Sequence, residues 1–151
     1  MNLVKYRNCF QEVFDVLKNL SGDQINFKPA SDKWSIHEII THLADCEVQS
    51  HVRIRAILAD REPRMLYHDE MDWSVILEYS KIELDESLEV IQLLRRVNYN
   101  LLSRLPDDYF NKTGIHSKRG EISLRGYIDL YIQHIERHLN QIKRNLTASH
   151  D

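Results

Sequence analysis

The chain has 151 residues, of which 42% are hydrophobic and 28% charged, and its formal net charge is −3 with the histidines counted neutral. These values are typical of one globular domain, covering residues 1–151, that buries a core without cross-links. The lysines and arginines are scattered among acidic residues and form no basic footprint. We therefore expect no nucleic-acid partner.

The cysteines and the apolar runs bear on cellular location. Cys9 and Cys46 are too few for a disulfide framework, and we expect both to be reduced. The opening MNLVKYRNCF carries Lys5 and Arg7 and leads into no long apolar segment of the kind found in signal peptides. No apolar run approaches the roughly 20 residues that a membrane helix needs. We expect a cytoplasmic protein with no membrane partner.

The first two predicted helices occupy the N-terminal part of the chain. Apolar residues recur every three or four positions from about Asn2 to Leu20, and Ser21-Gly22 is a helix stop signal. The second helix begins at Ser35, where Ser-Ile-His-Glu forms a capping box, and runs to about Ala59.

The third and fourth predicted helices follow a longer connection. A short helix is expected over residues 72–77, and a long one from about Asp85 that ends before Pro106. The stretch after Asp60 lacks alternation, so we expect no strands there. The fourth helix runs from near Ser123 to near Leu146 with a continuous isoleucine and leucine stripe.

Four long amphipathic helices are best satisfied by an all-α, antiparallel four-helix bundle. The spacing of the segments adds a long, partly helical connection between helices 2 and 3. We find no internal repeat and no second domain.

The fourth helix carries two histidines that can share a metal ion. His134 and His138 are four residues apart, which places their side chains on the same face of a helix. The pair lies at the margin of the apolar stripe, so we expect it in a cleft between helices. It is not a zincin motif, because Ile135 stands where that motif has glutamate, and the sequence has no Glu-x-x-His pair for a di-iron site.

His42 is the best candidate for a third ligand. It lies on the polar flank of the second predicted helix, whose early part can lie beside the fourth helix in an antiparallel bundle. Three protein ligands leave a position free for water or substrate, as in catalytic zinc sites. His42, His134 and His138 therefore predict one divalent metal ion. Three imidazoles do not select among zinc, nickel, copper and iron.

Other residues are expected near this site. Glu38 and Asp45 could accept a hydrogen bond from the second ring nitrogen of His42, as carboxylates often do for metal-bound histidines. A solvated helix face is the alternative for both. The other residues expected to line the pocket are Cys46, Trp73, Tyr127, Tyr131 and Gln141. Cys46 could instead be a small core residue or a fourth ligand.

The remaining candidates are interpreted as surface residues. Arg95 and Arg96 of the third long helix are expected to be solvated charges, and the alternative is that one of them faces a substrate carboxylate. The histidines expected at the surface are His37, His51, His68, His116 and His150. We assign no catalytic residue beyond the metal ligands.

Several motifs, in order and spacing, resemble the DinB-like superfamily of metal-binding four-helix bundles (DinB/YfiT-like). They are Trp34-Ser35 at the start of a helix, His42-Leu-Ala-Asp45, Tyr67-His-Asp-Glu-Met-Asp-Trp73, Gly120-Glu-Ile-Ser-Leu124, and His134-x-x-x-His138-x-x-Gln141-Ile142. The resemblance covers nearly the whole chain. It is closest to the bacillithiol-transferase-like branch, whose members are also described as metal-dependent hydrolases.

The resemblance implies a function and an assembly. It implies a three-histidine site for zinc or nickel on His42, His134 and His138, and a low-molecular-weight thiol as cosubstrate. The expected activity is thiol-dependent S-transfer to a small-molecule substrate, in a homodimer. The alternatives are a metal-dependent hydrolase and a non-enzymatic bundle that binds a metal or small ligand.

Overall fold

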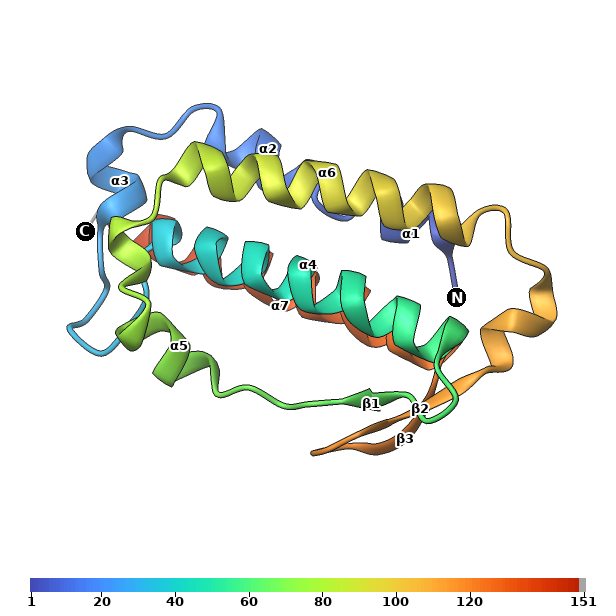
Figure 1. Ribbon diagram of the computed structural model, residues 1–151. Helices are drawn as coiled ribbons and strands as arrows, with labels where there is room; N and C mark the ends of the chain where they lie inside the picture. The colour runs from blue at the N-terminus through green and yellow to red at the C-terminus, as the bar shows by residue number, and fades with distance from the viewer. Residues whose placement is uncertain (150–151) are drawn as a thin grey trace.

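The computed structural model describes residues 1–149 as a bundle of long helices with a small sheet at one end (Figure 1). The three long helices are α4 (Ile36–Ala59), α6 (Leu84–Leu102) and α7 (Leu124–Ala148). The fourth position of the bundle is filled by α1 (Leu3–Asn8) and α2 (Gln11–Leu17) in succession. The predicted four-helix bundle is confirmed. Within these residues, no helix is both long and apolar enough to cross a membrane.

The long connection between α4 and α6 sets the direction of the helices. It contains β1 (Arg64–Met65), α5 (Glu70–Ile76) and a 3₁₀ turn (Tyr79–Lys81), and it passes back along the bundle before α6 begins (Figure 1). As a result α4 and α6 run in the same direction, and α7 runs antiparallel to both. The early part of α4 therefore lies beside the middle of α7.

Serine caps fix the starts of the two helices that carry the predicted metal ligands. The Ser35 hydroxyl accepts a hydrogen bond from the Glu38 amide at 3.2 Å, and the Glu38 carboxylate accepts one from the Ser35 amide at 2.8 Å. This is the predicted capping box. At α7 the Ser123 hydroxyl accepts from the Gly126 amide at 3.1 Å. The α7 stripe is buried, as its 3.6-residue period predicts.

The prediction of one continuous first helix is wrong. α1 ends at Asn8, α2 begins at Gln11, and a further short helix, α3, covers Gly22–Asn26. In an unbroken helix the Tyr6 carbonyl would accept from the amide four residues later. Here it accepts instead from the Arg95 guanidinium at 3.0 Å and from the Cys9 thiol at 3.3 Å. A contact from α6 thus interrupts the local helical pattern.

The expectation that the stretch directly after Asp60 contains no strands is also wrong, because β1 lies in it. β1 pairs in parallel with β2 (Thr113–His116), and β2 pairs in antiparallel with β3 (Gly120–Ser123). β1 has two residues, too few for alternation to be visible in the sequence. Gly114 permits the close packing of β2 on α4, because a Cβ there would lie 3.0 Å from the Ile57 side chain.

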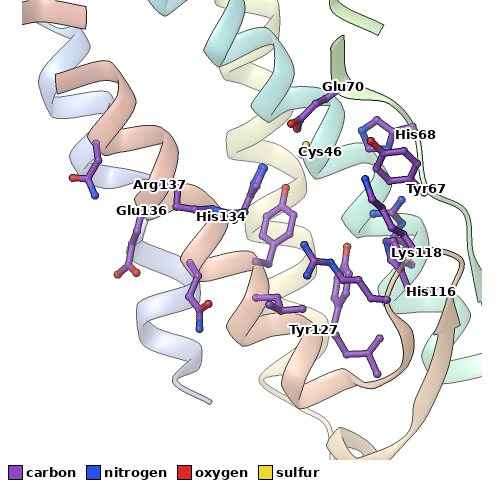
Figure 2. A pocket seen from close by; sticks show the side chains of 17 residues that line it. Cys46, Tyr67, His68, Glu70, His116, Lys118, Tyr127, His134, Glu136 and Arg137 are labelled. Carbon is purple, nitrogen blue, oxygen red and sulfur yellow. Dashed lines mark hydrogen bonds between the residues drawn. The ribbon is translucent and has the colours of Figure 1, made fainter. Parts of the chain in front are cut away.

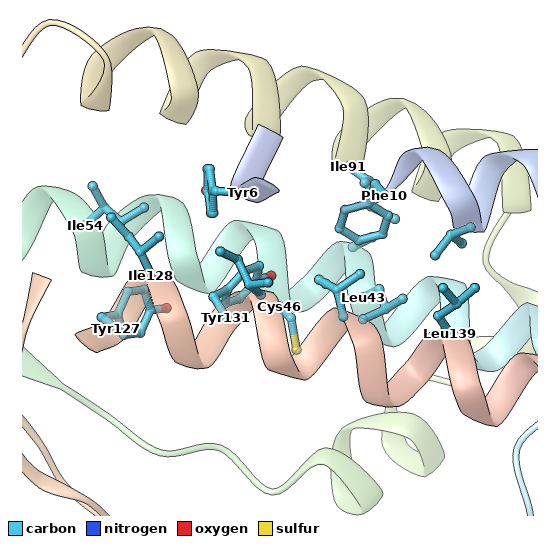
Figure 3. Close-up of a cluster of buried hydrophobic side chains, with 14 of the residues drawn as sticks. Tyr6, Phe10, Leu43, Cys46, Ile54, Ile91, Tyr127, Ile128, Tyr131 and Leu139 are labelled. Carbon is cyan, nitrogen blue, oxygen red and sulfur yellow. The ribbon is translucent and has the colours of Figure 1, made fainter. Parts of the chain in front are cut away.

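A buried ion pair crosses the core between α4 and α6. The apolar side chains of Tyr6, Phe10 and Ile91 meet those of α4 and α7 in one cluster (Figure 3). Within it, the Arg95 guanidinium pairs with the Glu47 carboxylate and lies over the rings of Tyr6 and Phe10. Arg95 is only 4% exposed, so its interpretation as a surface charge is wrong. Arg96, the next residue, is exposed as expected.

Candidate metal centre

The three predicted histidine ligands meet between α4 and α7. His42 lies two turns into α4, and its Nε2 atom is 3.4 Å from the Nε2 atom of His134 on α7. The Nε2 atom of His138, one turn later on α7, is 3.1 Å from the same atom. The Nε2 atom of His134 therefore lies within 3.4 Å of the Nε2 atoms of both other histidines.

These separations suit a metal ion. Nitrogen atoms about 2.0–2.1 Å from a tetrahedrally coordinated zinc ion lie roughly 3.3–3.4 Å apart. Burial lowers the pKa of His42 to about 3, that of His134 to about 2 and that of His138 to about 4, with neighbouring imidazoles adding to the effect for the first two. All three rings are neutral near pH 7, which is the form that binds metal. The donor set fits a divalent cation.

Contacts of the second ring nitrogens orient the site. The Nδ1 atom of His138 donates to the Gln141 side-chain carbonyl at 3.0 Å, so its Nε2 lone pair faces the other two rings. Gln141 was predicted near the site, and the structure gives it this role. The Nδ1 atom of His134 is buried and has no hydrogen-bond partner among residues 1–149.

Cys46 is the fourth side chain at this point. Its sulfur lies 3.5 Å from the His42 Nε2 atom, and the ligand atoms of His42, Cys46 and His134 all lie within 4.8 Å of one another. Burial raises the pKa of the Cys46 thiol, so it is protonated when no metal is present. Its place one turn after His42 on the same face of α4 explains the contact.

Glu70 reaches the site from the connection, and the sequence interpretation missed it. Its Oε2 atom lies 3.5 Å from the His42 Nε2 atom, and the side chain is 52% exposed. Asp69 caps α5 by accepting from the Met71 and Asp72 amides, which places Glu70 in the first turn. Only its place in the resemblance motif Tyr67–Trp73 could have suggested this residue.

Two tryptophans have different relations to the histidines. The Trp34 ring lies 4.9 Å from the His42 ring and is stacked on His138 at 6.5 Å, and its indole N–H donates to the Ser74 hydroxyl at 3.2 Å. Trp73, predicted to line the pocket, instead packs on the His68 ring at 4.4 Å. Trp34 therefore lies next to the histidines, whereas Trp73, which was predicted to line the pocket, does not.

Glu38 and Asp45 do not support His42 as proposed. Glu38 caps α4 and forms an ion pair with Lys28 at 2.6 Å. Asp45 accepts from the Tyr79 hydroxyl at 2.6 Å. Both carboxylates are thus engaged in fixing elements around the site, and neither is hydrogen-bonded to His42 in the described residues.

A cavity of about 990 Å³ lies beside His134, between α7 and the segment around β1 and β2 (Figure 2). Cys46, Tyr127, Tyr131 and His134 line it, so three predicted pocket residues are in place. Burial raises the pKa of Tyr127 and Tyr131, and both phenols stay protonated near neutral pH. They form its wall and are not poised as acids.

Two histidines expected at the surface also line this cavity. His116 is buried, and His68 is partly buried. Burial, followed by the nearby Arg53 charge, lowers the pKa of both. His37 and His51 are partly buried on α4, and His150 lies outside the described residues.

Comparisons with known proteins agree with this structure. A family model described as the DinB superfamily matches residues 5–142. The curated relatives include proteins named "Putative metal-dependent hydrolase": one from Oceanobacillus iheyensis, 27% identical over 139 residues (89% of this chain, 80% of the relative), and one from Bacillus cereus, 27% identical over 131 residues (87% and 75%).

A solved structure extends the comparison to the fold. YfiT from Bacillus subtilis, described as a probable metal-dependent hydrolase with an unusual four-helix bundle topology, matches with a TM-score of 0.86 and 22% sequence identity. The match covers 95% of this chain and 82% of YfiT. The family match and the shared bundle lead to one conclusion: the chain belongs to the DinB superfamily.

Proposed function

We propose that this protein is a metal-dependent enzyme that holds one divalent cation, zinc or nickel, on His42, His134 and His138. Its proposed activity is transfer of a low-molecular-weight thiol, of the bacillithiol type, to an electrophilic small molecule. The observation that carries the proposal is that the His134 Nε2 atom lies 3.4 Å from that of His42 and 3.1 Å from that of His138, beside a cavity of about 990 Å³. Relatives named as metal-dependent hydrolases support the metal dependence.

The residues around the cavity suit thiol chemistry. A divalent cation at the site would act as a Lewis acid and lower the pKa of a thiol that it binds. The Glu70 carboxylate, 3.5 Å from the His42 Nε2 atom and open to the cavity, is placed to accept the thiol proton. In the transfer, sulfur bonds to the electrophilic carbon while the leaving group departs with its bonding electrons.

Conjugation of thiols to 1-chloro-2,4-dinitrobenzene tests this activity. The zinc- and nickel-loaded proteins are assayed with bacillithiol and with cysteine, and His134→Ala is expected to abolish the metal-dependent rate. His37→Ala is the matched control, because His37 also lies on α4 but contacts Asn26 and the Ile82 carbonyl. A rate that is equal with and without metal would contradict the proposal.

Hydrolysis is the second candidate function. The cavity side of the site presents Glu70, a carboxylate that can accept a proton from water as readily as from a thiol. Relatives carry this activity in their names. Release of alcohol or amine from ester and amide panels, lost in both Glu70→Gln and His134→Ala, would favour hydrolysis over transfer.

A non-enzymatic metal site is the third candidate. Whether Cys46 binds the metal distinguishes it from the enzyme. If its sulfur is a fourth ligand, the site is closed and of the structural type. The cobalt-loaded protein separates these cases, since a thiolate ligand adds a charge-transfer band. We expect Cys46→Ser to leave the spectrum of the thiol-free protein unchanged.

We also propose that the protein is a homodimer. Val75, Ile76 and Leu77 at the end of α5 are exposed apolar residues, which suits an interface. Light scattering after gel filtration tests this, and a monomer at micromolar concentration would contradict it.

A further inference from the structure

The cavity beside the histidines has an unusual concentration of basic side chains. Arg53 reaches it from α4, Lys118 and Arg119 from the turn between β2 and β3, and Arg137 from α7. We call these four residues the basic rim. Figure 2 shows Lys118 and Arg137 entering from different elements, with His134 from α7 near Arg137.

The basic rim is not neutralised by the protein. Within residues 1–149, none of its four side chains has a carboxylate oxygen within 4 Å. The cavity also has two acidic residues: Glu136 pairs with Lys5 at 2.6 Å, and Glu70 lies at the histidine end, 3.5 Å from the His42 Nε2 atom. The cavity therefore has four basic residues against two acidic ones, in a chain whose net charge is −3. Such a local excess of one charge attracts ligands of the opposite sign.

The turn that carries two of these cations is held in place. Gly120 closes it with a φ of +76°, a conformation that side-chain-bearing residues rarely adopt. The Ser117 amide donates to the Met65 carbonyl at 3.0 Å, and the Ser117 hydroxyl accepts from the Tyr67 amide at 2.8 Å. The Lys118 ammonium lies 4.0 Å from the centre of the Tyr67 ring. The small sheet thus presents Lys118 and Arg119 on a fixed support.

Arg53 of α4 is anchored by the connection, beside Tyr67, and has hydrogen-bonding capacity left over. Its guanidinium donates to the Leu66 carbonyl, while its buried Nε atom has no partner among the described residues.

We propose that this cavity binds an anionic small molecule, with its carboxylate or phosphate group on the basic rim and its reactive end at His134, the predicted metal ligand that lines the cavity. This inference rests on the proposed function for the reactive end and adds the substrate class. Guanidinium groups bind both anions in bidentate geometry. A volume of about 990 Å³ suits a whole small molecule. Ile122 and Leu130 supply an apolar wall for its carbon skeleton.

Calorimetric titration of the zinc-loaded protein tests this inference without a catalytic readout. The probes are succinate, inorganic phosphate and succinamide, the neutral counterpart of succinate. Succinate or phosphate is expected to bind and succinamide is not, and the tighter anion identifies the preferred group. In Lys118→Gln/Arg119→Gln the dissociation constant should rise about tenfold or more, the effect of losing one charge-assisted hydrogen bond.

Matched controls separate the basic rim from other effects. Arg61→Gln/Arg96→Gln removes the same charge from exposed positions outside the cavity and should bind the anions like the wild type. Binding of succinate directly to zinc would be unaffected in Lys118→Gln/Arg119→Gln. Two results would overturn the inference: no binding of either anion at millimolar concentration, or equal affinities for the wild type and Lys118→Gln/Arg119→Gln.

The same titrations distinguish this inference from the proposed function. Anion binding that depends on Lys118 and Arg119, together with no thiol conjugation, would uphold the substrate class and refute the transferase. Thiol conjugation with no preference for anions would uphold the transferase and refute the substrate class.

Discussion

At the scale of single residues, the site depends on groups that burial has altered. The imidazoles of His42, His134 and His138 are kept neutral by their surroundings, and Gln141 fixes which nitrogen of His138 faces the other two. The His134/His138 pair was predictable because helical spacing makes residues four apart neighbours. Glu70, Lys118 and Arg119 were not, because they reach the site from segments distant in sequence.

The depressed histidine pKa values predict how stability depends on pH in the metal-free protein. Unfolded histidine titrates near 6.5, so below this pH the unfolded chain binds protons that the folded site resists. Stability is therefore full above pH 6.5 and falls as pH decreases toward about 3. Urea midpoints at pH 7.5 and 5.0 measure this. A chain with all three histidines changed to Gln should lose much less stability over that interval, and equal losses would contradict the assignment.

The buried pair of Glu47 and Arg95 predicts a large effect of a small change. Glu47→Gln leaves the Arg95 guanidinium buried without its counter-charge, which costs about 3–5 kcal/mol. Denaturant unfolding measures the loss. Lys18→Gln, which removes an exposed ion pair with Asp15, is the control and should leave the midpoint unchanged. A loss below about 1 kcal/mol for Glu47→Gln would refute the buried charge pair.

At the scale of elements, long periodic segments were predictable and short ones were not. The starts of α4 and α7 follow from Ser35 and Ser123, whose caps are local in sequence. The break between α1 and α2 depends on the Arg95 contact with the Tyr6 carbonyl, 89 residues away. β1 exists only because β2 pairs with it. Contacts with residues distant in sequence determine the α1–α2 break and β1. A short segment of sequence read by itself does not reveal those contacts.

The capping box of α4 predicts a coupling between helix start and metal site. Ser35→Ala removes the acceptor for the Glu38 amide and should cost about 1 kcal/mol of stability. Because His42 lies only two turns later, fraying of this end should also weaken zinc binding. Ser21→Ala, the equivalent change at α3, should leave zinc affinity unchanged. Equal zinc affinities in the wild type and Ser35→Ala would contradict the coupling.

At the scale of the whole molecule, the direction of the helices makes the site. The antiparallel arrangement of α4 and α7 brings His42 to His134 across 92 residues, and the returning connection adds Glu70. The four-helix bundle and the three histidines were predictable from periodicity, spacing and the family resemblance. The cavity was not, because it forms where α7, the β2–β3 turn and the connection meet.

The central claim is that three histidines hold one metal ion, and metal analysis of untagged protein tests it most directly. The wild type and His37→Ala should each contain about one zinc or nickel ion per chain, as a single three-ligand site requires. His42→Ala, His134→Ala and His138→Ala should lose most of it, while Cys46→Ser should retain it. Equal metal content in the wild type and the three alanine variants, or loss in Cys46→Ser with retention in His138→Ala, would contradict the claim.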